Sequence, residues 1–248
     1  MDKKLAILEY QNSFADNFST LAYGKIVEKK FYFDCVYENT TQKRVNFEDK
    51  MNNFNLPYLY MSKSHIDKVS AKSKYMDYRD IKHKSLNKNQ IINFDSFRIE
   101  DIKYLTKDIL SMFDFNNLSF LKNYDILEEI TSSNSIGLYI NTEDDIDLKY
   151  INDALIRLNK YVSKPVLYVF TAKELDCEFC IPYQKLSLDD WREEFYFLKS
   201  CKHKIIYCTK NSYSVGFWAS VLSQKNYYYN IYSKKLKQHC EYANWIEV

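Results

Sequence analysis

The chain has 248 residues, and 46% of them are hydrophobic, which suffices for one large domain or two small ones with a real core. Because 35 basic and 33 acidic side chains give a net charge of only +2, the composition excludes a general electrostatic attraction to nucleic acid. No segment approaches the roughly 18 consecutive apolar residues of a membrane helix, and residues 1–20 lack a signal-peptide core, so we expect a cytoplasmic protein.

The first elements predict the beginning of a parallel α/β unit. Residues 5–10 form an apolar run typical of a strand, residues 11–18 a polar turn, and the next stretch a helix that ends near Lys30. A second strand follows over residues 31–37. In a strand, helix, strand unit of this kind the helix crosses over the sheet, and the turn after the first strand faces the ligand crevice.

Residues 38–96 are rich in Asn, Lys and Ser and show no regular pattern. Between residues 62 and 88 the basic side chains outnumber three aspartates; they are Lys63, Lys68, Lys72, Lys74, Arg79, Lys82, Lys84 and Lys88. We interpret this stretch as a solvated surface, because it shows no clean basic amphipathic helix. The alternative is a surface for anionic lipid or an acidic acceptor, which would give peripheral contact with the inner face of the membrane.

Helical spacing returns in two successive segments, residues 97–115 and 120–132. Because no strand separates these two helices, they suggest a junction between lobes, and we place the boundary near residue 130. The prediction is therefore one lobe over residues 1–130 and a second over residues 131–248.

Beyond this boundary strands and helices alternate regularly. The predicted strands cover residues 135–140, 166–170, 204–208 and 227–232, and the predicted helices cover residues 150–162, 188–201 and 216–224. This alternation specifies a mostly parallel sheet flanked by helices on both faces, so the fold class is α/β.

The stretch from Leu188 to Leu222 contains the most informative turn of the second lobe. A helix with acidic first turns leads into a strand, and the polar residues 209–214 connect that strand to an apolar helix. Such a turn lies at the carboxyl end of a strand and the amino end of a helix, where α/β sheets place ligands and free backbone N–H groups bind phosphate. An ordinary helix N-cap is the structural alternative for Ser212 and Ser214.

The six cysteines are expected to be free thiols, because the sequence carries no export signal. Cys177 and Cys180 have the spacing of half a zinc site, and Cys201 and His203 follow at about the distance that such sites use. A four-ligand site needs a second compact pair, whereas Cys201 and His203 straddle the end of a predicted helix. We therefore expect unrelated thiols rather than a metal site.

Several separated motifs occur in an order that matches a known family. The C-terminal motifs are Cys201-Lys202-His203, Ile205-Ile206, Ser212-Tyr213-Ser214 and Phe217-Trp218. At the amino end, a turn with Asn12, Ser13, Asp16 and Asn17 precedes Leu21-Ala22-Tyr23-Gly24-Lys25. Together they resemble the bacterial α-1,2-fucosyltransferases. The resemblance covers both ends and most of the second lobe, but not residues 38–130.

The resemblance implies two Rossmann-like lobes, GT-B-like, with an acceptor side in the first lobe and a nucleotide-sugar donor side in the second. It implies transfer of fucose from GDP-fucose to a glycan acceptor, with inversion, in surface polysaccharide synthesis. No cofactor and no obligatory metal are expected. The donor-binding residues implied are Asn141, Thr142, Asp144, Thr171, His203, Ser212, Tyr213 and Ser214.

The family's central donor motif, His-x-Arg-Arg-x-Asp, is not kept. Tyr139 stands in place of the histidine, Asn141 and Thr142 in place of the arginines, and only Asp144 matches. Arginine can neutralise a diphosphate leaving group through charged, bidentate hydrogen bonds, whereas Asn and Thr supply no charge. Thr171 likewise follows its strand without the carboxylates that hold guanine in the family.

Glycine is also scarce, since the chain has three where average usage would give roughly 17, and the amino-terminal turn has lost its glycines. Three hypotheses remain. The chain is a divergent glycosyltransferase that uses other cations, with Lys173, Lys202 and Lys210 as candidates. Alternatively, it is a catalytically inactive relative that binds a glycan or a partner protein, or the match reflects biased composition alone. The sequence identifies no general base.

Overall fold

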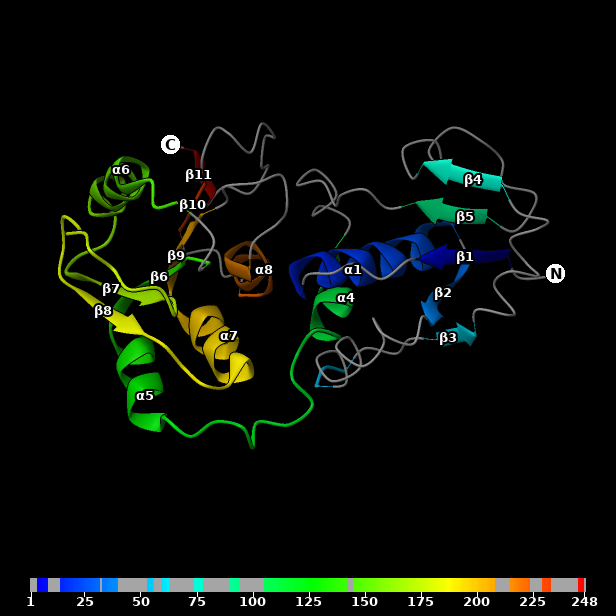
Figure 1. Cartoon of the computed structure of the whole chain (residues 1–248), viewed down its shortest axis with the longest axis horizontal. Helices are drawn as coiled ribbons and strands as arrows, with labels where there is room; N and C mark the ends of the chain where they lie inside the picture. Colours follow the sequence, from blue (N-terminus) through cyan, green and yellow to red (C-terminus); the bar gives the residue numbers. More distant parts are fainter. Residues whose placement is uncertain are drawn as a thin grey trace. The chain divides into compact units, whose positions relative to one another are not determined.

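The structure, a computed structural model, is shown in Figure 1. It describes residues 4–8, 14–31, 33–39, 53–55, 59–62, 74–77, 90–93, 105–141, 145–207, 215–223, 229–232 and 245–247. The chain divides into two compact units, Met1–Asn117 (unit 1) and Leu118–Val248 (unit 2). Each unit contains a parallel β-sheet.

The described strands of unit 1 lie in the order β3-β2-β1-β5-β4. Their bounds are β1 (Lys4–Leu8), β2 (Phe33–Asn39), β3 (Leu59–Ser62), β4 (Lys74–Asp77) and β5 (Gln90–Asn93). The predicted strand, helix, strand unit is confirmed, because α1 (Phe14–Phe31) connects β1 to β2 and these two strands pair in parallel. Since α1 begins at Phe14, the predicted polar turn over residues 11–18 is wrong from residue 14 onward, and residues 11–13 lie outside the described residues.

Aromatic packing holds a later segment of unit 1 against α1. The fully buried Phe18 ring lies 5.0 Å from Phe54 and 5.0 Å from Phe113, between ring centroids. The predicted helix over residues 97–115 is confirmed over α4 (Lys107–Ser111) and wrong beyond it, because α4 ends before Phe113; residues 97–104 lie outside the described residues. Beyond α4, backbone hydrogen bonds to residues 53 and 55 replace helical ones, so tertiary pairing overrides helical spacing.

Unit 2 contains a sheet whose described strands lie in the order β8-β7-β6-β9-β10-β11, all parallel. Their bounds are β6 (Asn134–Tyr139), β7 (Pro165–Phe170), β8 (Tyr183–Leu186), β9 (His203–Ile206), β10 (Asn230–Tyr232) and β11 (Trp245–Glu247). The chain builds one half of the sheet outward from β6 and then returns to β9 on the other side of β6. This is the Rossmann strand order, with its reversal between β6 and β9.

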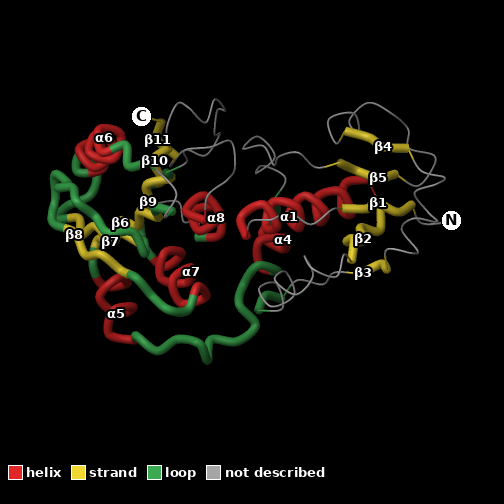
Figure 2. Tube along the Cα trace, in the orientation of Figure 1, coloured by secondary structure: helices red, strands yellow, loops and turns green. Residues whose placement is uncertain are grey.

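Helices cover both faces of this sheet, as predicted. They are α5 (Tyr124–Ser132), α6 (Leu148–Leu158), α7 (Trp191–Ser200) and α8 (Val215–Leu222). Buried residues of α6 pack with Ile136 and Leu138 of β6 on one face. Residues that alternate with these along β6 face α7 and α8, and Figure 2 shows α6 on the opposite side of the strands from α7 and α8.

Gly137 explains how α7 comes so close to β6. A Cβ atom at this position would lie 2.9 Å from Leu198 Cδ1 and 3.1 Å from Cys201 Sγ. A side chain here would make the Leu198 side chain shift and would crowd Cys201, so glycine suits this close packing.

The division between the units precedes α5, which contacts α7 and β6 of unit 2. It therefore lies earlier in the chain than the boundary that we placed near residue 130. Within the described part of the chain, no helix has the length and apolar character required to cross a membrane. The side chains of the basic stretch between residues 62 and 88 lie outside the described residues.

Candidate functional site

The carboxyl ends of the strands of unit 2 form one edge of the sheet, which we call the carboxyl edge. Asn141 lies just beyond β6 and is exposed, while Thr171 follows β7 and is buried. Their strands end in register, because the Ile140 N–H donates to the Phe170 carbonyl at 3.1 Å. In doubly wound sheets ligands bind at this edge, where the strand order reverses.

Helix α6 begins at the carboxyl edge, and its amino terminus is already occupied by the chain itself. The Asp147 carboxylate is the N-cap and accepts a hydrogen bond from the Tyr150 N–H at 3.0 Å. The Asp147 N–H donates to the Tyr207 hydroxyl at 2.6 Å, and that hydroxyl donates in turn to the Asp145 carbonyl. A phosphate would meet negative charge here, because Asp145 and Asp147 are both exposed acidic residues.

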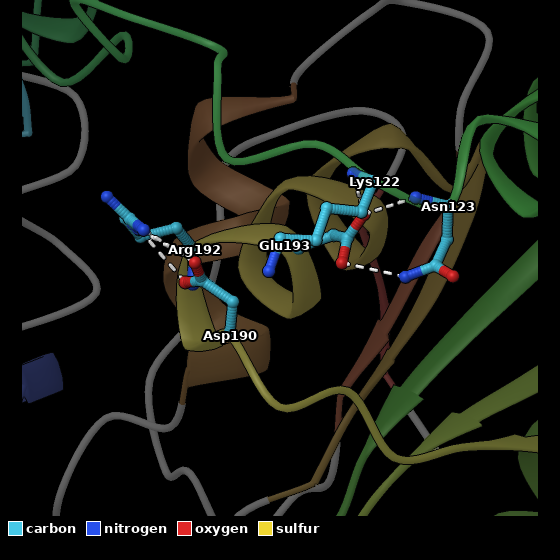
Figure 3. Close-up of polar contacts among 5 residues, drawn as sticks. All are labelled: Lys122, Asn123, Asp190, Arg192 and Glu193. Atoms are coloured by element: carbon cyan, nitrogen blue, oxygen red, sulfur yellow. Dashed lines mark hydrogen bonds and ion pairs between the residues drawn. The ribbon is translucent and has the colours of Figure 1, made fainter.

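The amino terminus of α7, which follows β8, is also capped from within. The Asp190 carboxylate accepts from the Arg192 N–H at 2.9 Å and forms an ion pair with the Arg192 guanidinium at 2.6 Å. These hydrogen bonds lower the pKa of the Asp190 carboxyl below its ordinary value. Figure 3 shows the two side chains facing each other at the start of the helix.

The next residue of α7, Glu193, anchors the segment that leads into α5. Its buried carboxylate accepts from the backbone N–H groups of Lys122 and Asn123 at 2.6 and 2.7 Å, and from the Asn123 side chain at 2.9 Å (Figure 3). Nearby, the Arg192 guanidinium lies 5.2 Å from the centre of the Phe120 ring, a cation–π contact. The structure thus shows a structural partner for each of these groups.

Helix α8 differs from α6 and α7. It follows β9, and its first turn contains no acidic residue. The predicted phosphate-binding residues Ser212, Tyr213 and Ser214 directly precede it and lie outside the described residues. Three described helices, α6, α7 and α8, start at the carboxyl edge of this sheet. An aspartate caps α6 and α7, whereas the described residues at the start of α8 include no acidic residue.

The predicted donor-binding residues separate into three groups. Asn141 and Thr171 lie together at the carboxyl edge, and the Thr171 hydroxyl accepts from the Lys173 N–H at 3.1 Å. His203 does not join them, because it is the first residue of β9. Four residues of extended chain at about 3.3 Å each place it roughly 13 Å from Tyr207. The residues outside the described part of the chain are Asn12, Ser13, Thr142, Asp144, Ser212, Tyr213 and Ser214.

For Asp16 and Asn17 the structure describes the backbone alone, which belongs to the first turn of α1. The sequence pattern predicts a turn for both residues. They lie in the helix instead, because it already begins at Phe14.

His203 is buried at the amino edge of the sheet, where it packs against Tyr229. Its Nδ1 atom accepts from the Tyr229 N–H at 3.0 Å, and its ring stacks on Tyr229 with 5.6 Å between centroids. Burial lowers the pKa of the imidazole to about 4, so it is neutral at pH 7. A neutral, buried histidine that holds a backbone N–H does not offer a charge to a diphosphate.

Lys204, beside it, is a fully buried cation. Its Nζ atom donates to the Cys201 carbonyl at 2.6 Å, just after the carboxyl end of α7, where positive charge is favourable. Burial lowers its pKa to about 8 and raises the pKa of the Cys201 thiol to about 12. Among the described residues, no group of three His, Cys, Asp or Glu side chains is placed to hold a metal ion.

The sequence analysis did not identify two further residues, which lie toward the carboxyl edge of unit 2. Tyr207 was read only as part of a strand, although an aromatic residue that ends a buried strand at the ligand edge is a detectable signal. Glu194 lies in the first turns of α7, and burial raises its pKa to about 7. Its neighbours in sequence are also acidic, so nothing in the sequence alone distinguishes it.

Comparison with known proteins supports the fold by structure and not by sequence. No family model and no curated protein sequence matches the chain. The fucosyltransferase NodZ from Bradyrhizobium matches with a TM-score of 0.53 and 13% identity, over 88% of this chain and 92% of that chain. NodZ α-1,6-fucosyltransferase co-crystallised with GDP matches with a TM-score of 0.54 and 13% identity, over 90% and 93%.

This likeness extends over most of both units, and it confirms the predicted α/β, GT-B-like fold with two lobes. It gives no support to the α-1,2 linkage, because the enzyme described in that structure is an α-1,6-fucosyltransferase. At 13% identity it establishes the fold alone. The chain therefore has the fold of fucosyltransferase structures, with a Rossmann-type second unit.

Proposed function

We propose that the chain is a divergent glycosyltransferase that transfers a sugar from a nucleotide-sugar donor to a glycan acceptor. The observation that carries this proposal is the likeness to a fucosyltransferase over 90% of this chain and 93% of the other. A match to one unit alone would indicate only a Rossmann-type sheet, which many unrelated proteins share.

In this proposal the donor lies at the carboxyl edge of unit 2, beside Asn141 and the start of α8. The amino termini of α6 and α7 are capped by Asp147 and Asp190, which leaves α8 as the described helix start that suits a diphosphate. The hydroxyl groups of Ser212 and Ser214 would supply hydrogen bonds at that turn.

Transfer requires three events at this site. An acceptor hydroxyl oxygen bonds to the anomeric carbon, the bond from that carbon to the nucleotide diphosphate breaks, and a base takes the acceptor's proton. Positive charge must also stabilise the leaving diphosphate. Of the lysines considered from sequence, Lys173 lies just beyond β7 at the carboxyl edge, whereas the Lys202 N–H bonds Ser135 at the amino edge.

Fucose, a guanine nucleotide and a role in surface polysaccharide synthesis follow only from the resemblance. No obligatory metal is part of the proposal. The basic stretch between residues 62 and 88 gives the option of peripheral attachment at the inner face of the membrane, near such acceptors. The α-1,2 linkage is one of several that an acceptor screen would distinguish.

A second candidate function is that of an inactive relative that binds a glycan or a partner protein. The observation that favours it is the acidic character of the segment after β6. Asp145 and Asp147 are exposed there, close to where the family has paired arginines. A diphosphate would be repelled by these carboxylates unless a lysine offsets them.

Nucleotide binding separates the two functions. The full chain would be titrated with GDP, UDP, CDP and CMP and their sugar conjugates while thermal unfolding is followed. A ligand at 100 times its dissociation constant adds about 2.7 kcal/mol of stability. Stabilisation by one nucleotide, and release of that nucleotide from its sugar conjugate with a glycan acceptor present, support the enzyme. Binding of glycans without any nucleotide response supports the inactive relative.

A further inference from the structure

The strand order of unit 2 reverses between β6 and β9, and Tyr207 lies at the end of β9 where these two strands are neighbours. It follows β9 directly, and its ring belongs to the core that β6 and β9 share with α6. Its hydroxyl lies at the carboxyl edge, where residues 145–147 lead into α6. The side chain is 4% exposed, so its position is fixed by packing.

That hydroxyl makes two hydrogen bonds to the backbone of the segment after β6. It accepts from the Asp147 N–H at 2.6 Å and donates to the Asp145 carbonyl. Both the donor and the acceptor capacity of one phenol are therefore used on one short piece of chain. Asp147 is also the N-cap of α6, so the same contact fixes where the helix begins.

We propose that Tyr207 is a positioning residue for the nucleotide-sugar site, because its hydroxyl holds the backbone of Asp145 and Asp147, which lead into α6, at the carboxyl end of β9. The proposal rests on the proposed function, in which the donor lies at this edge of the sheet. Tyr207 touches no substrate in this account. It acts by fixing the backbone at the start of α6, beside the donor.

A neighbouring tyrosine provides a matched control. The Tyr150 hydroxyl, on α6, donates to the Ile206 carbonyl at the end of β9 at 2.9 Å, and the two tyrosine rings lie 6.0 Å apart. Tyr150 thus ties the same helix to the same strand, but its hydroxyl donates to a carbonyl of β9, whereas the Tyr207 hydroxyl bonds the backbone of Asp145 and Asp147. Removing either hydroxyl should cost similar stability, while only Tyr207 should affect the site.

The experiment compares Tyr207→Phe with Tyr150→Phe in the full chain. Affinity is measured by calorimetry for the nucleotide diphosphate, among GDP, UDP and CDP, that stabilises the wild type. We expect Tyr207→Phe to weaken binding roughly tenfold, about 1.4 kcal/mol, and Tyr150→Phe to leave it within twofold. Hydrogen exchange of residues 141–150 without nucleotide should accelerate in Tyr207→Phe alone.

The outcomes separate this inference from the proposed function. Faster exchange together with weaker binding in Tyr207→Phe supports the positioning role. If the wild type binds and Tyr207→Phe binds equally well, the positioning role is overturned and the glycosyltransferase stands. Equal weakening by both variants also overturns it, because the effect then reflects general loss of packing. If the wild type binds none of the nucleotides, both proposals fall.

Discussion

The two edges of the sheet of unit 2 differ in what their polar groups do. At the amino edge, His203 and Lys204 are buried and each has a backbone partner at the end of a neighbouring element. At the carboxyl edge, Asn141 is exposed, and Tyr207 holds the segment that follows it. The short strand β9 runs from one edge to the other, because His203 begins it and Tyr207 follows its last residue. Neighbouring residues of one sequence motif therefore lie at opposite edges of the sheet, the amino edge and the edge where we propose that the ligand binds.

This comparison predicts that substitutions at the amino edge change stability, whereas substitutions at the carboxyl edge change nucleotide affinity. The largest effect is expected for Lys204→Ala. It removes a buried side chain and leaves the Cys201 carbonyl without the amine, at a cost of about 3 kcal/mol in free energy of unfolding. Urea denaturation measures this loss.

Lys204→Met is the matched control, because it keeps the length of the side chain and needs no charge in the core. It should cost about 1 kcal/mol. Both variants should bind nucleotide like the wild type while folded. A tenfold loss of affinity in folded Lys204→Met would mean that the amino edge takes part in binding.

We expect Glu194, at the amino end of α7, to make the stability of the fold depend on pH. Burial raises its pKa in the folded chain to about 7, from an ordinary value of 4.5. The folded state therefore holds its proton more tightly, and the stability this gives is present below pH 4.5 and lost as the pH rises through 7. Because part of the carboxyl is exposed, we expect Glu194→Gln to be more stable than the wild type at pH 8 by roughly 2 kcal/mol.

Denaturation midpoints between pH 4.5 and 8 test this directly. The difference between Glu194→Gln and the wild type should grow across that range. Glu128→Gln, at an exposed position of α5, should show no such trend. A constant difference for Glu194→Gln would contradict the assignment.

A smaller effect is predicted for the turn before α8. Replacing Ser212 and Ser214 by alanine together should weaken nucleotide binding about tenfold, or 1.4 kcal/mol, because their hydroxyl groups would bind the diphosphate. Ser223→Ala, at the other end of the same helix, is the control. Unchanged affinity in the double variant would remove this turn from the site.

The smallest effect is predicted for His203 at the amino edge. Burial lowers its pKa to about 4 from 6.5, so the unfolded chain binds the proton first. The stability contributed by the neutral imidazole is present above pH 6.5 and lost as the pH falls toward 4. His203→Gln should reduce this acid-side loss by about 1 kcal/mol at pH 5, measured against the wild type. An equally steep loss in both proteins would show that His203 is not the titrating group.

The alternation of strands and helices in unit 2 was predictable, because core strands such as β6 and β7 are apolar on both faces. The edge strands β8 and β11 were missed. Such strands are short and half exposed, so they carry little hydrophobic pattern; β8 reads Tyr-Gln-Lys-Leu. The unassigned residues 38–96 contain β3, β4 and β5, which have four residues each.

The candidate site was predictable only as far as strand ends reveal it. That Asn141 and Thr171 lie at the carboxyl edge was predictable, because each follows an apolar strand; their role in binding a donor, which the resemblance implies, stays a prediction. His203 was grouped with them by motif, although the residue before a predicted parallel strand must lie at the opposite edge. The position of Tyr207 at the end of a buried strand was detectable from sequence, but its hydrogen bonds were not, because their partners, residues 145 and 147, lie about 60 positions earlier in the chain.

Hydrogen exchange of the full chain with and without nucleotide tests the central claim most directly. GDP, UDP and CDP would each be added at a concentration that saturates any thermal shift. The account predicts slower exchange at residues 140–147 and 207–216, at the carboxyl edge, and no change at residues 200–204 and 229. Protection at residues 200–204 without protection at the carboxyl edge would contradict it.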